Sequence, residues 1–478
     1  MMQSITVGAW LVITALFGAD PQAQQTPAEI RSEALKTLKQ AATFYRNKVA
    51  NHSGYVYYYS FDLTQRWGEG QESLNTIVIQ PPGTPTVGMA YLKAYAATDD
   101  PFYRDAARET AGALVYGQLE SGGWTQVVKF TPAKRFGQYR NGKGGSMNIS
   151  SLDDNQTQSA LTMLMLTDEA LKFQDPAIHE AATYGLNALL KAQFPNGAFP
   201  QVWTGPVEPH PIVKAKYPDY DWKTEGRVKN YWDYYTLNDG LAGTVCDTLL
   251  TAHRIYQEQR YLDAVRKLGD FLILAQMPEP QPAWCQQYNY DMVPIWARKF
   301  EPPAVTGWES QDVIETLIKI YRATGDKKYL APIKPALAYL KTCLLLDHRI
   351  PRYLELTTNK PLYMDAKYQL TYDDSAVPAH YGWKQDIHLH HIEQKLADAE
   401  SLTENVPRTA ADIEPRVRHI IHELDDDGRW VSAYGGEYLV GQPKFPKSPF
   451  PYISSQVFSR NLEVLSEYLA ATRPKAAK

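Results

Sequence analysis

The chain has 478 residues, of which 44% are hydrophobic and 21% charged, so it is long enough for one large globular domain or two ordinary ones. Its net charge of −4 argues against nucleic acid as a partner, because nucleic-acid binding normally requires a basic surface. Only three cysteines are present, which excludes a disulfide-stabilised scaffold, and we expect Cys246, Cys285 and Cys343 to be small buried apolar residues.

The first 23 residues resemble a signal peptide. An apolar run from Val7 to Phe17 is followed by Pro21, by the small residue Ala23 and then by a polar stretch. The run is too short to span a membrane as a stable helix, and the alternative is a frayed N-terminus. We therefore expect a secreted or periplasmic protein in which residues 1–23 are removed and residues 24–478 form a single domain.

A pattern of paired helices recurs four times after an expected first helix at residues 28–49. In each copy an amphipathic helix ends at a turn, and a second helix rich in alanine follows. Asp99, Asp175 and Asp326 mark this turn in three copies, whereas Gln259 and Arg260 replace the aspartate in the third. The first helices of the pairs include residues 89–95, 161–173, 248–256 and 314–321.

A second motif closes three of these pairs. It consists of a Gln, a loop, and an aromatic residue followed by Gln, and its copies are Gln118 with 122–126, Gln193 with 196–201 and Gln276 with 283–287. Such helix pairs cannot bury their apolar faces alone, so we expect them to stack around an axis. With a last helix at residues 456–471, the sequence predicts a mainly α fold, an incomplete α/α toroid, with short β segments over residues 349–383.

Acidic residues stand where three of the inner helices are expected to begin. When these helix starts are aligned, Asp154, Asp239 and Glu309 occupy equivalent places. A single acid there is explained by helix capping, which contributes about 0.5–2 kcal/mol. Three acids in register, with Asn155 and Asn238 beside them, favour a site for a hard cation such as Ca²⁺, which prefers oxygen ligands.

Two adjacent cations precede the last of these acids. Arg298 and Lys299 stand between Trp296 and Phe300, with Glu301 next along the chain. This combination suits an acidic sugar, because a cation can bind the carboxylate while aromatic rings contact the pyranose faces. The alternative is a surface Arg–Glu pair beside a core Trp.

These motifs together resemble the pectate lyases of polysaccharide lyase family 10. The resemblance covers roughly residues 118–383, and it depends on the order in which the motifs follow one another. It implies an α/α toroid, Ca²⁺ as the cofactor, and β-elimination on polygalacturonate, an acidic polysaccharide. The motifs are residues 122–126, 152–157, 195–201, 236–239, 296–303 and 307–310.

The resemblance also implies roles for individual residues. Asp239 matches an acid that binds the catalytic calcium, Asp154 another acid of the substrate and metal centre, and Arg298 the arginine proposed as the base. Since arginine has a high pKa, we expect calcium and Lys299 to favour its neutral form and activity to rise at alkaline pH. Glu309 is the third expected metal ligand. The expected substrate-binding residues are Asp154, Lys299, Trp296, Trp124, Arg352 and His380.

The chain departs from the family pattern at three places, which leaves the exact substrate open. His380 stands where the family has an arginine, Gly240 follows Asp239 where a larger polar residue is common, and residues 217–232 lengthen a loop. One alternative function is an α/α-toroid glycoside hydrolase acting on uronic-acid oligosaccharides with two of the three acids as catalysts. Another is a non-catalytic glycan-binding protein. We expect a monomer without stable membrane insertion.

Overall fold

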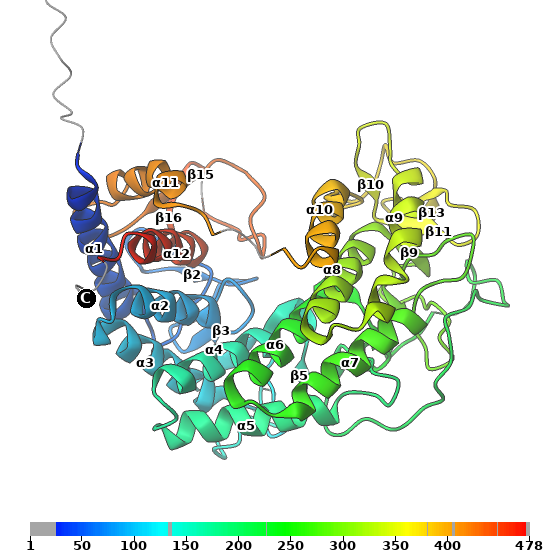
Figure 1. Ribbon diagram of the computed structural model, residues 1–478, viewed down its shortest axis with the longest axis horizontal. Helices are drawn as coiled ribbons and strands as arrows, with labels where there is room; N and C mark the ends of the chain where they lie inside the picture. Colours follow the sequence, from blue (N-terminus) through cyan, green and yellow to red (C-terminus); the bar gives the residue numbers. More distant parts are fainter. Residues whose placement is uncertain are drawn as a thin grey trace, which may run out of the picture.

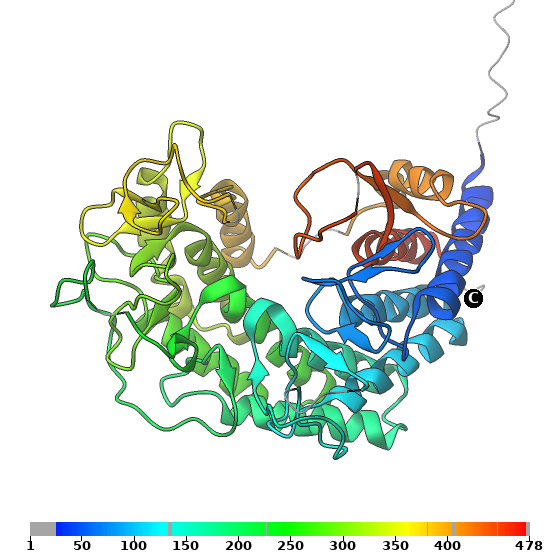
Figure 2. The same cartoon turned by 180° about the vertical axis from the view of Figure 1, so that it is seen from behind.

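The structure is a computed structural model that describes residues 25–131, 136–225, 227–379, 381–403, 407–446 and 448–474. Over these residues the chain is mainly helical, and its helices form two curved layers (Figures 1 and 2). The expected signal peptide and His380 lie outside the described residues. Within the described part, no helix combines the length and the apolar character needed to cross a membrane.

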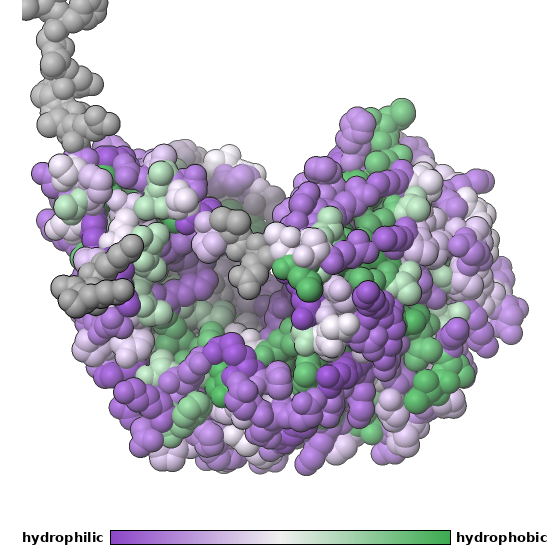
Figure 3. Space-filling model, viewed as in Figure 1, coloured by the Kyte–Doolittle hydropathy of each residue, from purple (hydrophilic) through white to green (hydrophobic). Residues whose placement is uncertain are grey.

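The inner layer is a row of helices in which each helix contacts the next. Figure 1 shows that this row curves into an arc whose α10 end stands apart from its α12 end, and the space-filling view is hollowed between the two ends (Figure 3). The predicted incomplete α/α toroid is therefore confirmed. The inner row is α12 (Ser455–Ala471), α2 (Thr84–Thr98), α4 (Gln156–Ala170), α6 (Leu241–Tyr256), α8 (Gly307–Thr324) and α10 (Leu389–Glu400).

An outer layer of helices covers the inner row. The predicted first helix is α1, extended by the π-helical turn η1, and its capping box joins Thr26 and Glu29. The outer helices are α11 (Ala410–His422), α1 (Pro27–Phe44) with η1 (Tyr45–Val49), α3 (Pro101–Gly117), α5 (Pro176–Lys191), α7 (Gln259–Leu274) and α9 (Ile333–Thr342).

Aspartates at the predicted turns cap the elements that follow. Asp99, the residue expected to mark the first turn, instead ends α2 in a left-handed conformation, and its neighbour Asp100 begins α3. Asp100 accepts a hydrogen bond from Phe102 N at 2.9 Å, and Asp175 accepts one from Ala177 N at 3.2 Å, each before a proline at the first helical position. In the fourth copy Asp326 caps the short helix η5 (Lys327–Leu330) before α9. In the third copy, which lacks the aspartate, Glu258 makes no side-chain cap.

The closing glutamines fasten each pair of helices to the next. The amide of Gln118 donates to Gly122 O in its own loop and to Ala181 O in α5, both at 2.9 Å. Gln193 bonds in the same way to its loop and to α7, and Gln276 to its loop and to the segment before α9. The repeated Gln thus has a structural role between neighbouring outer helices.

Short strands fix where the inner helices begin. A strand before each inner helix from α2 to α8 pairs antiparallel with a strand further along the chain, which holds these helix starts beside one another. The pairs are β3 (Thr76–Val78) with β4 (Val127–Lys129), β5 (Ser150–Ser151) with β6 (Val202–Trp203), β7 (Tyr235–Thr236) with β8 (Gln287–Tyr288) and β9 (Ala304–Thr306) with β11 (Tyr353–Glu355).

The remaining strands lie at the two ends of the arc. The β segments predicted over residues 349–383 are present, and a second sheet joins the first and last parts of the chain through β1 and β16. The strands are β10 (Ile350–Pro351), β12 (Pro361–Met364), β13 (Leu370–Thr371) and β14 (Lys384–Gln385) at one end, and β1 (Tyr58–Ser60), β2 (Arg66–Trp67), β15 (Val431–Tyr434) and β16 (Phe450–Ser454) at the other.

The buried apolar residues form two large clusters. One is built mainly from α4 to α10, the other from α1, α2, α11, α12 and the sheet of β1 and β16, and Leu166 of α4 packs against both. Cys246, Cys285 and Cys343 are buried and free, as the sequence predicted. The core thus lies between the two helix layers and holds the helix starts of the inner row in place.

Candidate active site

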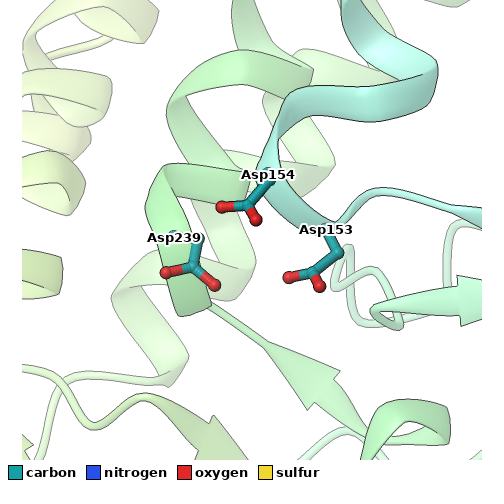
Figure 4. Close-up of side chains that lie close together, drawn as sticks. All are labelled: Asp153, Asp154 and Asp239. Atoms are coloured by element: carbon teal, nitrogen blue, oxygen red, sulfur yellow. The ribbon is translucent and has the colours of Figure 1, made fainter. Parts of the chain in front are cut away.

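Three aspartates meet where α4 and α6 begin. Asp153, Asp154 and Asp239 each offer a carboxylate oxygen, and these oxygens lie within 4.8 Å of one another (Figure 4). The sequence predicted that Asp154 and Asp239 would converge. It did not predict Asp153, although that residue is adjacent to Asp154 in the same motif.

An uncommon backbone conformation precedes both helices. The short helical turns η2 (Asp153–Asn155) and η4 (Asn238–Gly240) place Asp154 at φ 45° and Asp239 at φ 53°, and Asn155 and Gly240 follow, also left-handed. Each left-handed non-glycine residue costs on the order of 1–3 kcal/mol and is typical of functional sites. Neither helix receives a side-chain cap here, so the acids are available to each other and to a ligand.

Amide groups hold the three carboxylates. Asp153 accepts from Gln201 Nε2 at 2.7 Å, Asp154 from Gln80 Nε2 at 3.0 Å and Asp239 from Asn238 Nδ2 at 2.5 Å. These donors are neutral, so they orient the carboxylates without cancelling their negative charge.

Removal from water, together with mutual repulsion, raises the pKa of two of these acids. Asp154 keeps an exposed surface, but the surrounding protein removes part of its water, and this, with the charges of Asp153 and Glu69, raises its pKa to about 6. Partial burial and the charges of Asp154 and Asp153 raise the pKa of Asp239 well above its ordinary range. A bound cation would relieve this repulsion.

The donor set fits a calcium ion. Calcium prefers carboxylate, amide and water oxygens, and these acids with their Asn and Gln neighbours supply oxygen ligands. Among the residues that the structure describes, no His or Cys joins the group, so the site does not have the nitrogen and sulfur ligands typical of zinc.

The expectation that Glu309 is part of this cluster is wrong. Glu309 is fully buried, with Oε1 3.6 Å from the guanidinium of Arg352 and 3.4 Å from Gln286 Nε2. The reason lies in the backbone, because α8 follows β9 directly from an extended Thr306 without a left-handed turn. Glu309 therefore sits in the first turn of the helix and points into the protein, and Asp153 takes the place expected for it.

Arg298 lies beside the acids and is held by Glu301. Its guanidinium is 2.6 Å from Glu301 Oε1, and its backbone N donates to Oε2 of the same carboxylate at 3.1 Å. Burial opposes the charge of Arg298, but Glu301 outweighs it and raises the pKa of Arg298 above its usual value. The expectation that Lys299 favours a neutral Arg298 is thus not met in these surroundings. The charge of Arg298 in turn lowers the pKa of Asp154.

Arg352 completes the cationic side of the site. Its side chain is 11% exposed, and its guanidinium carbon lies 4.2 Å from the centre of the Tyr381 ring. The hydroxyl of Tyr381 donates to Glu301 Oε1 at 3.0 Å, which connects Arg352 with the pair of Glu301 and Arg298. The charge of Arg352 lowers the pKa of Asp239, so this predicted substrate-binding residue acts electrostatically on the acids.

The other predicted substrate-binding residues lie in different surroundings from one another. Lys299 is exposed, with its ammonium 3.8 Å from the centre of the Tyr368 ring, and Trp296 is half-buried near Arg298. The prediction for Trp124 is wrong. Its ring is fully buried and its Nε1 donates to Leu114 O at 2.9 Å, so it belongs to the core and cannot touch a sugar.

The N-terminal part of the chain contributes residues that the sequence motifs did not reveal. The amide of Gln80 donates to Asp154 at 3.0 Å and to Glu69 at 3.1 Å. Glu69 is therefore a further acid beside the cluster. No sequence signal pointed to this pair, because both residues precede the motifs and reach the site only through the long-range fold.

The comparisons with known proteins concern the part of the chain that carries the three aspartates and Arg298. Residues 132–342 match the family described as pectic acid lyase, and this stretch contains the three aspartates and Arg298. The resemblance predicted from the motifs is therefore confirmed over residues 132–342. No curated protein sequence matches the chain significantly.

Solved structures with similar folds are distant in sequence. A mutant of a family 10 polysaccharide lyase from Cellvibrio cellulosa, in complex with trigalacturonic acid, is 17% identical with a TM-score of 0.46, and the match covers 67% of this chain and 98% of that one. A cellobiose 2-epimerase from Spirochaeta thermophila is 13% identical with a TM-score of 0.47, and the match covers 94% of this chain and 99% of that one.

Proposed function

We propose that this protein is a pectate lyase that cleaves polygalacturonate by calcium-assisted β-elimination. The observation that carries the proposal is the meeting of three aspartates, within 4.8 Å, with Arg298 close enough to shift the pKa of Asp154. The family match over residues 132–342 supports the same reaction class. We also propose that residues 24–478 form one catalytic domain, that residues 1–23 direct secretion, and that the enzyme acts as a monomer.

Asp239, Asp154 and Asp153 would hold the calcium ion. When bound, calcium polarises the carboxylate of the substrate and so makes the proton on the neighbouring C5 atom more acidic. Removal from water raises the pKa of Asp154 and Asp239, and repulsion among the three carboxylates raises it further; this repulsion supports a cation at this place.

Arg298 and Arg352 would act on the sugar itself. Arg298, in its neutral form, removes the C5 proton, the electron pair of the C–H bond forms the C4–C5 double bond, and the glycosidic C4–O bond breaks. The departing oxygen takes a proton from water. Arg352 would bind the uronate carboxylate and stabilise the charge that develops there. Glu301 orients Arg298 through two contacts but raises its pKa, so we expect the rate to rise at alkaline pH.

The short separation of Asp154 and Asp239 disfavours an inverting glycoside hydrolase that uses this pair. Inverting enzymes need two carboxyl groups about 6.5–9.5 Å apart and retaining enzymes about 5–5.5 Å. Asp154 and Asp239 offer oxygens within 4.8 Å of each other, which suits ligands that share one cation better than an acid and a base on opposite sides of a sugar.

The test is to incubate the purified protein with polygalacturonate, with calcium or with a chelator. A lyase forms an unsaturated product that absorbs in the near ultraviolet, and we expect that absorbance to rise only with calcium. New reducing ends without the chromophore would identify a hydrolase, and binding without any cleavage would identify a glycan-binding protein.

A further inference from the structure

A cationic surface adjoins Arg298. Two adjoining pockets lie there, one of 560 Å³ and one of 330 Å³, and Arg227 and Lys299 line both. The first pocket also contains Lys229 and Arg298, and the second Lys367. We call Arg227, Lys229, Lys299 and Lys367 the cationic strip.

The charges of the cationic strip are available to a ligand. Among the described residues, no carboxylate lies within 4.0 Å of any of the four side chains, and all four residues are exposed. Two neighbouring cations, in contrast, do have a carboxylate partner: Lys223 is paired with Glu355 and Arg298 with Glu301. Of the described residues that line the two pockets, Glu225 is the single acid. In a chain with a net charge of −4, this is a local concentration of positive charge.

The loop that carries Arg227 is attached to the segment that carries Arg298. Val228 N donates to Trp296 O at 3.1 Å, and Arg227 forms a parallel β-bridge with Trp296. The lengthened loop of residues 217–232 is therefore held beside the candidate site. Aromatic rings accompany the cations, since Tyr231 and Phe300 line the first pocket and Tyr368 the second.

We infer that the cationic strip forms binding subsites for uronate residues that flank the cleaved bond, so that the enzyme favours chains with several consecutive unesterified uronates. This inference rests on the proposed function. A polyuronate carries one carboxylate per sugar, and a row of unpaired cations beside aromatic rings complements both its charges and its pyranose faces. A methyl ester removes the negative charge and with it the attraction to the cationic strip.

The test compares two triple variants that lose the same charge. Arg227→Gln/Lys229→Gln/Lys367→Gln changes the cationic strip, and Lys36→Gln/Lys48→Gln/Lys191→Gln changes three exposed lysines of α1, η1 and α5. Initial rates are measured with trigalacturonate and hexagalacturonate in calcium, and the affinity for hexagalacturonate is measured by calorimetry. Thermal melting of both variants checks that they are folded.

We expect the strip variant to raise the KM and the Kd for hexagalacturonate about tenfold, as three exposed ion pairs predict, and the KM for trigalacturonate much less. The difference from the wild type should shrink at high salt and on a methyl-esterified chain. An unchanged Kd and KM for hexagalacturonate, or equal losses in the control variant, would overturn the inference. If the wild type binds hexagalacturonate through the strip but forms no unsaturated product, the proposed function fails and the cationic strip stands.

Discussion

The starts of α4 and α6 differ from the start of α8, although all three helices follow a short paired strand at the same place in the repeat. In the first two, Asp154 and Asp239 adopt left-handed conformations before the helix begins. In the third, Thr306 is extended and the helix begins at once. The first two acids meet in one cluster, whereas Glu309 is buried beside Arg352.

This difference shows that sequence register alone does not decide where a repeated acid points. The left-handed turn is made possible by the residue that follows the acid, because Asn155 and Gly240 are residue types that tolerate positive φ. Glu309 has no such turn before it and therefore becomes part of the packing between α8 and Arg352.

The largest effect is expected at Arg298, whose charge acts on the acids of both left-handed turns. Replacing Arg298 with Ala should lower kcat about 10²–10⁴-fold, because the proton acceptor is removed. The measurement is the rate of near-ultraviolet absorbance on polygalacturonate. Arg349→Ala serves as control, since this exposed residue pairs with Asp347 away from the acids. A variant at Arg298 with more than a tenth of the wild-type kcat would contradict its role.

Calcium affinity should fall much more when the acid at a left-handed helix start is replaced than when the acid at the start of α8 is replaced. Asp239→Asn removes a charged ligand and should weaken calcium binding about 100-fold or more, since even outer-shell changes at metal sites cost about 10–100-fold. Glu309→Gln should change it less than about fivefold, because Glu309 lies outside the cluster. Calorimetric titration of calcium measures both. Equal losses in the two variants would show that the comparison between helix starts is mistaken.

The free energy of unfolding should depend on the left-handed turn before α6. Gly240 has φ 68°, and an added Cβ would lie 3.2 Å from the Trp308 ring, so Gly240→Ala should lower the free energy of unfolding by about 2 kcal/mol. Gly142→Ala is the matched control, because Gly142 has φ 73° but open space around it. We expect a loss of about 1 kcal/mol there. Chemical denaturation measures the difference. An equal loss in both variants would mean that the Trp308 ring moves aside without a cost in free energy.

An effect no larger than that of Gly240→Ala is expected from Asp312, which joins the starts of α6 and α8. Its Oδ2 accepts from Gly243 N at 3.3 Å, and removal from water raises its pKa to about 7. The folded chain therefore binds more protons than the unfolded chain between about pH 4 and pH 7, so this residue lowers stability as the pH rises through that window.

Asp312→Asn removes this dependence. We expect the variant to gain up to about 2 kcal/mol of unfolding free energy relative to the wild type between pH 5 and pH 8, a value reduced by the partial exposure of the side chain. Denaturation at both pH values in a chelator measures it. A constant difference between the two proteins would show that Asp312 does not titrate in this range.

The sequence predicted what depends on local patterns. The helix pairs and the aspartate caps at their turns follow from periodicity and capping chemistry, and Asp154 and Asp239 converge because their helix starts are repeated. Glu309 was misplaced because equivalent sequence positions do not have the same backbone φ, and φ cannot be read from the sequence. Trp124 was misplaced because an aromatic in a glycine-rich loop has the same sequence pattern in a core as in a groove. Gln80 and Glu69 reach the site through long-range packing that no motif records.

Two helices were also not predicted from the sequence. They are α10 (Leu389–Glu400), which begins within a run of histidines, and α11 (Ala410–His422), which contains Pro415. Neither feature is typical of a helix, so the sequence did not indicate one. α10 buries four residues and α11 buries three, and in each helix the buried positions are spaced for a single face. Such helices depend on packing against the rest of the arc and therefore give a weak signal in the sequence alone.

The most direct test of the account is a crystal structure of the Arg298→Ala variant with calcium and an oligogalacturonate bound. The account predicts one calcium ion among Asp153, Asp154 and Asp239, in contact with a uronate carboxylate, and a sugar C5 atom facing the position left by the Arg298 side chain. Calcium bound elsewhere, or a sugar chain that does not reach the three aspartates, would contradict it.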